Sequence, residues 1–106
     1  MNDIQFCEAQ KGDLKYIVQM LADDPLGIKR ERFESPLPSS YSNAFDSIDK
    51  DSNNALILAI LKDEIIGVFQ LTFIPNLTYQ GSWRAMIEGV RVSSKFRSKG
   101  IGQSLI

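Results

Sequence analysis

The pattern of hydrophobic and polar residues in the first part of the chain predicts a strand followed by a helix. Alternation over residues 2–9 places Ile4 and Phe6 on one face of a strand. Asp13 is then a suitable N-cap for a helix. The apolar stripe of that helix, spaced i, i+3, i+4, i+7, is formed by Leu14, Ile17, Val18 and Leu21.

A loop and a second helix are predicted next. Pro25 cannot continue the hydrogen bonds of the first helix, and residues 28–40 mix charges with prolines and serines, which favours a loop with a short helical piece. Ser40 is expected to cap the second helix, which ends before residues 49–54. One side of this helix carries Tyr41, Ala44, Phe45 and Ile48.

The second half of the chain has the strongest strand pattern. Residues 55–61 and 65–74 flank a polar turn at 62–64, which predicts a hairpin, and residues 84–92 predict a further strand. A final helix is expected from Gly100. The order β-α-α-β-β-β-α predicts an α/β (α+β) fold with a mixed, mostly antiparallel sheet flanked by helices. We expect one domain spanning residues 1–106.

Composition excludes several classes of function. Twelve basic and thirteen acidic residues give a net charge of −1, which argues against nucleic-acid binding. The chain has no histidine, so Ser-His-Asp and Cys-His catalysis are excluded and a metal site is not expected. A single cysteine, Cys7, cannot form an internal disulfide and fits a cytoplasmic protein. The longest apolar run, residues 55–61, is too short to cross a membrane.

The candidate chemistry lies in the segment FRSKGIGQSLI at residues 96–106. Gly100 and Gly102 expose the first amides of a helix, where the helix dipole favours an anion such as a diphosphate. Arg97 and Lys99 add cationic donors. The alternative interpretation is an ordinary turn between a strand and a helix. The P-loop pattern is absent, and the chain supplies two of the three glycines of a dinucleotide-binding loop.

The segment RSKGIG matches, position for position, the pattern [QR]-x-x-G-x-[GA] of GNAT-type N-acetyltransferases. Upstream, IEGVRVSSKF resembles the fourth strand of that family, and the earlier order of elements is similar to its N-terminal half. The resemblance extends over nearly the whole chain but over about the first two-thirds of a complete family domain.

The resemblance implies an enzyme that transfers an acetyl group from acetyl-CoA directly to a primary amine of a small molecule or peptide, without a metal. It assigns the pyrophosphate to the main chain of Arg97, Ser98, Lys99, Gly100, Ile101 and Gly102, helped by Gln103. The pantetheine arm would lie beside Val90, Arg91 and Val92, where a backbone amide would steady the oxyanion.

Glu88 is the candidate general base, acting through water. Simple alternation places it on the same face as Met86, Val90 and Val92, and these apolar neighbours are expected to raise its pKa. A bulge at Gly89 would change this parity. The alternative interpretation is a structural carboxylate on an edge strand.

Acceptor residues are harder to assign. The resemblance makes Tyr41, Tyr79 and Trp83 weak candidates for the acceptor site, although the helical spacing of Tyr41 and Phe45 favours a place in the core. No tyrosine matches the residue that protonates the leaving thiolate in the family, so the general acid is unassigned.

We expect that the fourth strand has an open, apolar edge through which the chain forms a homodimer. A truncated or cleaved form, a shortened gene product, and a chain completed by a second copy all fit an end at Ile106, and truncation is favoured. The alternative function is an inactive CoA-binding or oligomer-forming remnant of an acetyltransferase.

Overall fold

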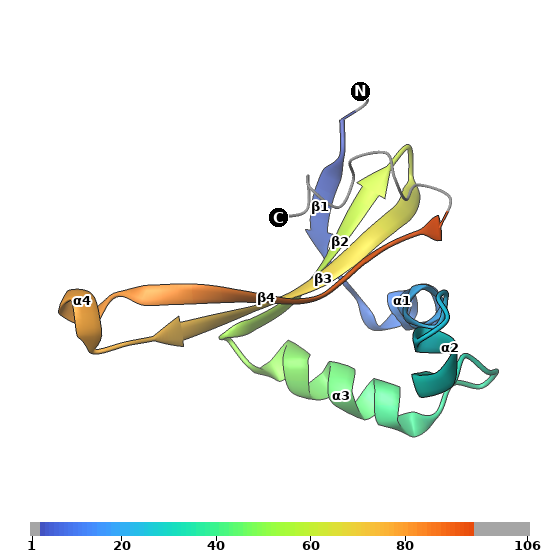
Figure 1. Ribbon diagram of the computed structural model, residues 1–106, viewed down its shortest axis with the longest axis horizontal. Helices are drawn as coiled ribbons and strands as arrows, with labels where there is room; N and C mark the ends of the chain where they lie inside the picture. The colour runs from blue at the N-terminus through green and yellow to red at the C-terminus, as the bar shows by residue number, and fades with distance from the viewer. Residues whose placement is uncertain (1–2, 95–106) are drawn as a thin grey trace.

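A computed structural model describes residues 3–94 and shows a sheet with helices on one side (Figure 1). The helix predicted from Gly100 lies outside these residues. The described helical segments and strands follow one another along the chain in the order β1, η1, α1, α2, α3, β2, β3, α4, β4. Their bounds are β1 Gln5–Glu8, η1 Lys11–Asp13, α1 Leu14–Leu21, α2 Gly27–Arg30, α3 Ser39–Lys50, β2 Asn54–Leu61, β3 Glu64–Pro75, α4 Thr78–Gly81 and β4 Trp83–Val92.

The described strands form a four-stranded sheet in the order β1-β2-β3-β4, and every neighbouring pair is antiparallel. Helices α1, α2 and α3 lie together below the sheet in Figure 1. This arrangement confirms the predicted fold class. The hairpin between β2 and β3 is closed by Lys62 and Asp63, whose φ angles of 50° and 64° suit a tight two-residue turn.

The core lies between the helices and one face of the sheet. Helix α1 contributes Ile17, α3 contributes Phe45, and the sheet contributes Leu58 and Val68, all of them buried. The predicted stripe of α1 and the core position of Phe45 are therefore confirmed. A second apolar cluster, built around Phe69, lies on the opposite face of the sheet.

The helix caps differ from the prediction. Ser40 is not a cap, because α3 begins at Ser39 and Pro38 takes the N-cap position with φ −54°. Asp13 precedes α1 as expected, but its side chain makes no cap hydrogen bond to that helix. Its carboxylate instead accepts a hydrogen bond of 2.8 Å from the Gln10 backbone N–H.

Strands β3 and β4 extend beyond the helices as a two-stranded arm (Figure 1). Residues 75–83, predicted as a loop, form the end of β3, the turn α4 and the start of β4. Within α4, Tyr79 and Gln80 have φ angles of 51° and 62°, so this segment is a tight turn and not a regular helix. Leu77 and Tyr79 are 97% and 90% exposed at its tip.

Candidate functional site

The ladder between β3 and β4 is interrupted at Gly89. Gln70 pairs with Glu88 and Val68 pairs with Arg91, so one residue of β3 lies opposite two residues of β4. Gly89 has a φ of +61°, a conformation that glycine adopts without the strain that a Cβ would introduce. A β-bulge, the feature that would change the parity of simple alternation, is therefore present at this position.

The bulge overturns the face assignment that simple alternation gave. Glu88 lies opposite Gln70, and Met86 lies opposite Thr72, so Glu88 and Met86 share the face that continues from the helix-covered core. Val90 and Val92 pack instead against the cluster around Phe69 on the other face. The expectation that Glu88 shares a face with both valines is wrong because of the extra residue.

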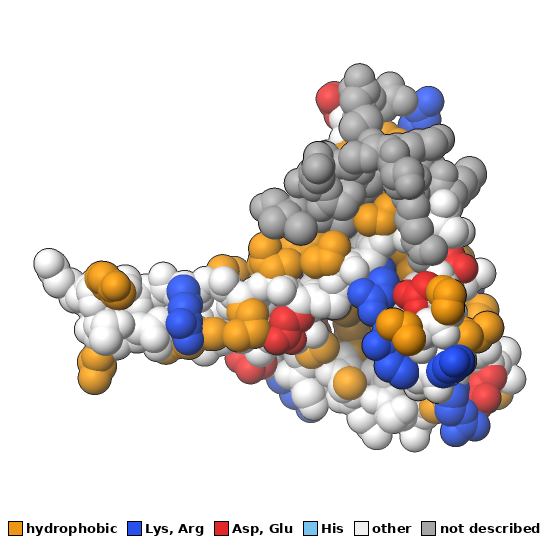
Figure 2. Space-filling view, viewed as in Figure 1, with side chains coloured by type: hydrophobic (Ala, Val, Ile, Leu, Met, Phe, Trp, Pro, Cys, Tyr) orange, Lys and Arg blue, Asp and Glu red, His pale blue; other side chains and the backbone are white. Residues whose placement is uncertain are grey.

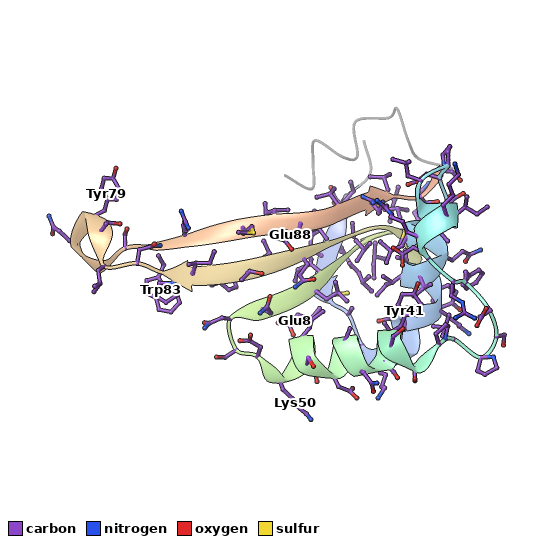
Figure 3. The ribbon with its side chains drawn as sticks, turned by 60° about the horizontal axis from the view of Figure 1, so that its bottom comes forward. Glu8, Tyr41, Lys50, Tyr79, Trp83 and Glu88 are labelled. Atoms are coloured by element: carbon purple, nitrogen blue, oxygen red, sulfur yellow. The ribbon has the colours of Figure 1, made fainter. Side chains whose placement is uncertain are left out.

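The surroundings of Glu88 are polar and open to solvent. Its side chain is exposed, so the apolar environment that was expected to surround it is not found among the described residues. Next to it on β3 is Gln70, which donates a hydrogen bond of 3.1 Å to Asn54 Oδ1. Thr72 Oγ1 donates to the same oxygen at 2.7 Å. Figure 3 shows Glu88 part-way along β4, between the arm and the body of the molecule.

Asn54, Gln70 and Thr72 were not identified from the sequence, yet they line the face that carries Glu88. The alternation in VFQLTF, residues 68–73, contained the signal, because Gln70 and Thr72 are two polar residues spaced by two in an apolar strand. Such a pair indicates that one face of this part of the strand is not buried in the hydrophobic core.

Arg91 links β4 to the segment between α1 and α2. Its Nε lies 3.8 Å from Asp24 Oδ2, and its Nη1 donates a hydrogen bond of 2.9 Å to the Val90 carbonyl. Both side chains are largely shielded, and Arg91 Nε is buried without a hydrogen-bond partner among the described residues. The Arg91 side chain is therefore held between β4 and the segment that carries Asp24.

Asp24 is held by its own segment as well. The Gly27 backbone N–H donates to Asp24 Oδ1. This hydrogen bond, together with the positive charge of Arg91, holds the pKa of Asp24 below its ordinary value of 3.8. Gly27 is buried, and a Cβ on it would lie 2.0 Å from the Leu21 carbonyl oxygen. The segment from Leu21 to Gly27 is thus fitted closely around the Asp24–Arg91 contact.

Replacing Asp24 with asparagine is expected to lower the free energy of unfolding at pH 7. A carboxyl whose pKa is depressed in the folded state stabilises that state above its unfolded pKa, and this contribution disappears as pH falls through the folded pKa. The difference between wild type and Asp24→Asn should therefore shrink below about pH 4. Urea denaturation between pH 7 and pH 3 measures it. Asp63→Asn, in the exposed β2–β3 turn, is the control; an equal loss in both variants would contradict the prediction.

The predicted acceptor residues are not brought together. Tyr41 on α3 is half-buried; its hydroxyl donates to Glu31 Oε1 at 2.7 Å and accepts from the Arg32 backbone N–H at 2.9 Å. Burial raises the pKa of Tyr41. Tyr79 and Trp83 lie at the other end of the molecule, at and near the tip of the arm (Figure 3). Trp83 is 61% exposed there.

An open hollow of about 1040 Å³ lies beside the end of β4. Its walls come from α1, the segment after α2, the β2–β3 turn, and Ser93 and Ser94 after β4. Glu88 does not line it, so the hollow and the candidate base are separate features. Within residues 3–94, its lining contains more acidic than basic side chains: Asp23, Glu31, Glu34, Asp63 and Glu64 against Arg32.

The residues assigned to the pyrophosphate, Arg97 to Gln103, lie outside the part of the chain that the structure describes. Within residues 3–94, no group of three His, Cys, Asp or Glu side chains is placed to hold a metal ion. None of the helices between those residues has the length and apolar character needed to span a membrane.

Comparison with known families gives a match to the model of the acetyltransferase (GNAT) family over residues 17–106. This is most of the chain. The chain belongs to the GNAT acetyltransferase family. Membership implies acetyl transfer, and it confirms the resemblance that the segment RSKGIG indicated. A comparison with curated proteins gave no match.

Solved structures show the same GNAT fold. A protein described as a transcriptional regulator from Bacillus halodurans C-125 is 58% identical, with a TM-score of 0.88 over 97% of this chain and 69% of its own. A GNAT family acetyltransferase from Staphylococcus aureus has a TM-score of 0.72 at 20% identity, covering 99% of this chain and 73% of its own. Glucosamine-6-phosphate N-acetyltransferase from Arabidopsis thaliana has a TM-score of 0.71 at 15% identity, covering 97% and 69%.

Proposed function

We propose that this GNAT protein transfers the acetyl group of acetyl-CoA directly to a primary amine of a small molecule or peptide. The interruption of the β3–β4 ladder at Gly89 is the observation that carries the proposal. It falls immediately before Val90, Arg91 and Val92, on the strand that lies at the edge of the sheet formed by the described residues. Backbone groups on the outer side of this strand are suited to hydrogen-bond an extended pantetheine chain as a neighbouring strand would.

The reaction needs the acceptor amine in its neutral, deprotonated form. An alkyl ammonium with a pKa near 10 is a free amine in only about one molecule in a thousand at neutral pH. Glu88 accepts that proton through a water molecule. The amine nitrogen then attacks the thioester carbonyl, the C–N bond forms, the C–S bond breaks, and CoA leaves as a thiolate. A backbone N–H beside the bulge stabilises the oxyanion between these two steps.

The charge of the hollow beside β4 supports a cationic acceptor. Among the described residues, five acidic side chains and one arginine line it, and this part of the lining favours an ammonium group over an anion. The hollow borders the end of the strand to which the proposal assigns acetyl-CoA. Acceptor amines with further positive charges are therefore expected to react better than neutral ones.

Calorimetry with CoA and thiol release from acetyl-CoA test the proposal. The wild-type protein should bind CoA and release thiol with at least one amine among polyamines, amino acids and aminoglycosides. Gly100→Ala should weaken CoA binding about tenfold or more, because a Cβ obstructs the approach of phosphate oxygens to the main chain. Gly12→Ala is the matched control, since a Cβ there meets nothing within 4 Å. Absence of CoA binding by the wild type would overturn the proposal.

A second candidate is binding of CoA without turnover, in a regulatory protein. The 58% identical relative is described as a transcriptional regulator, which favours considering this role. The same two measurements separate the candidates. CoA binding without thiol release across the amine panel would favour the second.

The proposal includes three further properties of the chain. Residues 1–106 belong to a single acetyltransferase domain, of which they form about the first two-thirds, and the protein functions in the cytoplasm. The outer side of β4, which has no neighbouring strand among the described residues, joins two copies in a homodimer, because a strand at a sheet edge readily adds another strand.

A further inference from the structure

The guanidinium of Arg91 connects the segment between α1 and α2 with the backbone of β4. Its Nε lies 3.8 Å from Asp24 Oδ2, and its Nη1 donates to the Val90 carbonyl at 2.9 Å. Arg91 lies opposite Val68, a buried residue of the core, so its side chain is on the helix-covered face of the sheet. The end of β4 lies beside α1 and α2 in Figure 1, and Figure 2 shows basic and acidic side chains gathered over these helices.

The Val90 carbonyl points to the outer side of β4. Arg91 is paired with Val68 on β3. Two residues further on, the Ser93 N–H donates to the Ile66 carbonyl at 2.8 Å. Because N–H groups alternate between the two sides of a strand, the Arg91 N–H points toward β3 as well. The trans peptide group between Val90 and Arg91 then directs its carbonyl the opposite way, to the side where the proposed function places pantetheine.

We infer that Arg91 and Asp24 are positioning residues for acetyl-CoA: the Asp24 carboxylate holds the Arg91 guanidinium, which fixes the direction of the Val90 carbonyl. This peptide group needs such a constraint because it follows the bulge at Gly89, where the regular ladder to β3 is interrupted. The hydrogen bond from Arg91 replaces part of the order that the ladder loses there. The inference rests on the proposed function, since it deals with how the cofactor is held at that site.

The chemistry of both side chains suits this arrangement. A planar guanidinium presents N–H groups in several fixed directions, so it can contact a carboxylate and a carbonyl at once. Asp24 is fixed in turn, because the Gly27 N–H donates to its Oδ1 while its Oδ2 faces Arg91. This hydrogen bond is the main cause that lowers the pKa of Asp24, so the carboxylate is charged at neutral pH.

Stability of the fold accounts less well for the same contacts. Arg91 Nε is buried without a hydrogen-bond partner among the described residues, and its distance to Asp24 Oδ2 is too long for a hydrogen bond. A buried donor without an acceptor lowers stability. An ion pair that served the fold alone would be expected to satisfy this donor. The guanidinium directs its hydrogen bond instead to Val90, at the proposed cofactor site.

Arg91→Lys separates positioning from stability. The lysine keeps a positive charge near Asp24, so the variant should unfold at nearly the same urea concentration as the wild type. A single ammonium cannot also hold the Val90 carbonyl in the same geometry. Calorimetry should therefore give a Kd for CoA about tenfold higher. The KM for acetyl-CoA should rise by a similar factor, while kcat at saturating acetyl-CoA stays within about twofold of the wild type.

Asp24→Asn tests the residue that holds the arginine. The amide keeps an oxygen for the Gly27 N–H but lacks the charge that attracts Arg91. It should weaken CoA binding in the wild-type background and have little further effect in the Arg91→Lys background, because the two side chains act together. Lys11→Gln is the matched control; it breaks an exposed ion pair of 3.0 Å with Asp46 and should leave the Kd for CoA unchanged.

The outcomes distinguish this inference from the proposed function. CoA binding by the wild type with an unchanged Kd in Arg91→Lys and Asp24→Asn would overturn the positioning role alone. A lower kcat with an unchanged KM would also overturn it, because loss of folded enzyme reduces the rate without changing the affinity of the remaining molecules. Absence of CoA binding by the wild type would overturn both the proposed function and the positioning role.

Discussion

Glu88→Gln is expected to lower kcat for acetyl transfer about 100-fold at pH 7 while leaving the KM for acetyl-CoA unchanged. The amide cannot accept the proton of the acceptor ammonium, and a positioned general base contributes about 10²–10⁴-fold. The loss should become smaller as pH approaches 10, because more of the acceptor is then a free amine. Thiol release measured between pH 6.5 and 9.5 gives both results.

Glu8→Gln provides the control for that experiment. Glu8 is also an exposed carboxylate on a strand, but it lies on β1 and pairs with Ile57, away from the bulge. This variant should keep the wild-type kcat. Because the Glu88 side chain is exposed, Glu88→Gln should also unfold at the same urea concentration as the wild type. Full activity in Glu88→Gln would identify Glu88 as the structural carboxylate of the alternative interpretation.

Gly27→Ala is expected to reduce the free energy of unfolding by about 3 kcal/mol. The new methyl group would lie 2.0 Å from the Leu21 carbonyl oxygen, a backbone atom that cannot rotate away. The segment between α1 and α2 must therefore shift, which also breaks the hydrogen bond from the Gly27 N–H to Asp24. Urea denaturation followed by circular dichroism measures the loss.

The matched glycine substitution is Gly12→Ala. A Cβ at Gly12 meets no atom within 4 Å, so this variant should change the free energy of unfolding by no more than about 0.5 kcal/mol. Similar losses in both variants would show that the close approach at Gly27 does not determine stability.

Local sequence pattern was sufficient for most of the fold. The spacing of Leu14, Ile17 and Val18 identified the buried face of α1, and the apolar runs on either side of Lys62 identified the central hairpin. Both signals come from residues close in the chain, where periodicity reflects burial directly. The caps were less predictable, because Ser40 has the preferred chemistry but Pro38 fixes where α3 begins.

The site depended on contacts that no local pattern contains. Asp24 and Arg91 are far apart in sequence, and nothing near either residue indicates that they meet. The face of Glu88 depended on whether Gly89 forms a bulge, which alternation alone cannot decide. The distance of Tyr79 from the rest of the site follows from the length of the arm, and that length depends on how far β3 and β4 stay paired.

The arm also affects how stability is distributed over the molecule. Its two strands lie beyond the helices, and most of β4 is exposed from Trp83 to Gly89. Backbone amides there are protected mainly by hydrogen bonds between two strands, whereas β2 is shielded by neighbours on both edges and by α3. Local opening of the arm therefore requires much less free energy than global unfolding, and the outer hairpin can fray while the helix-covered half stays native.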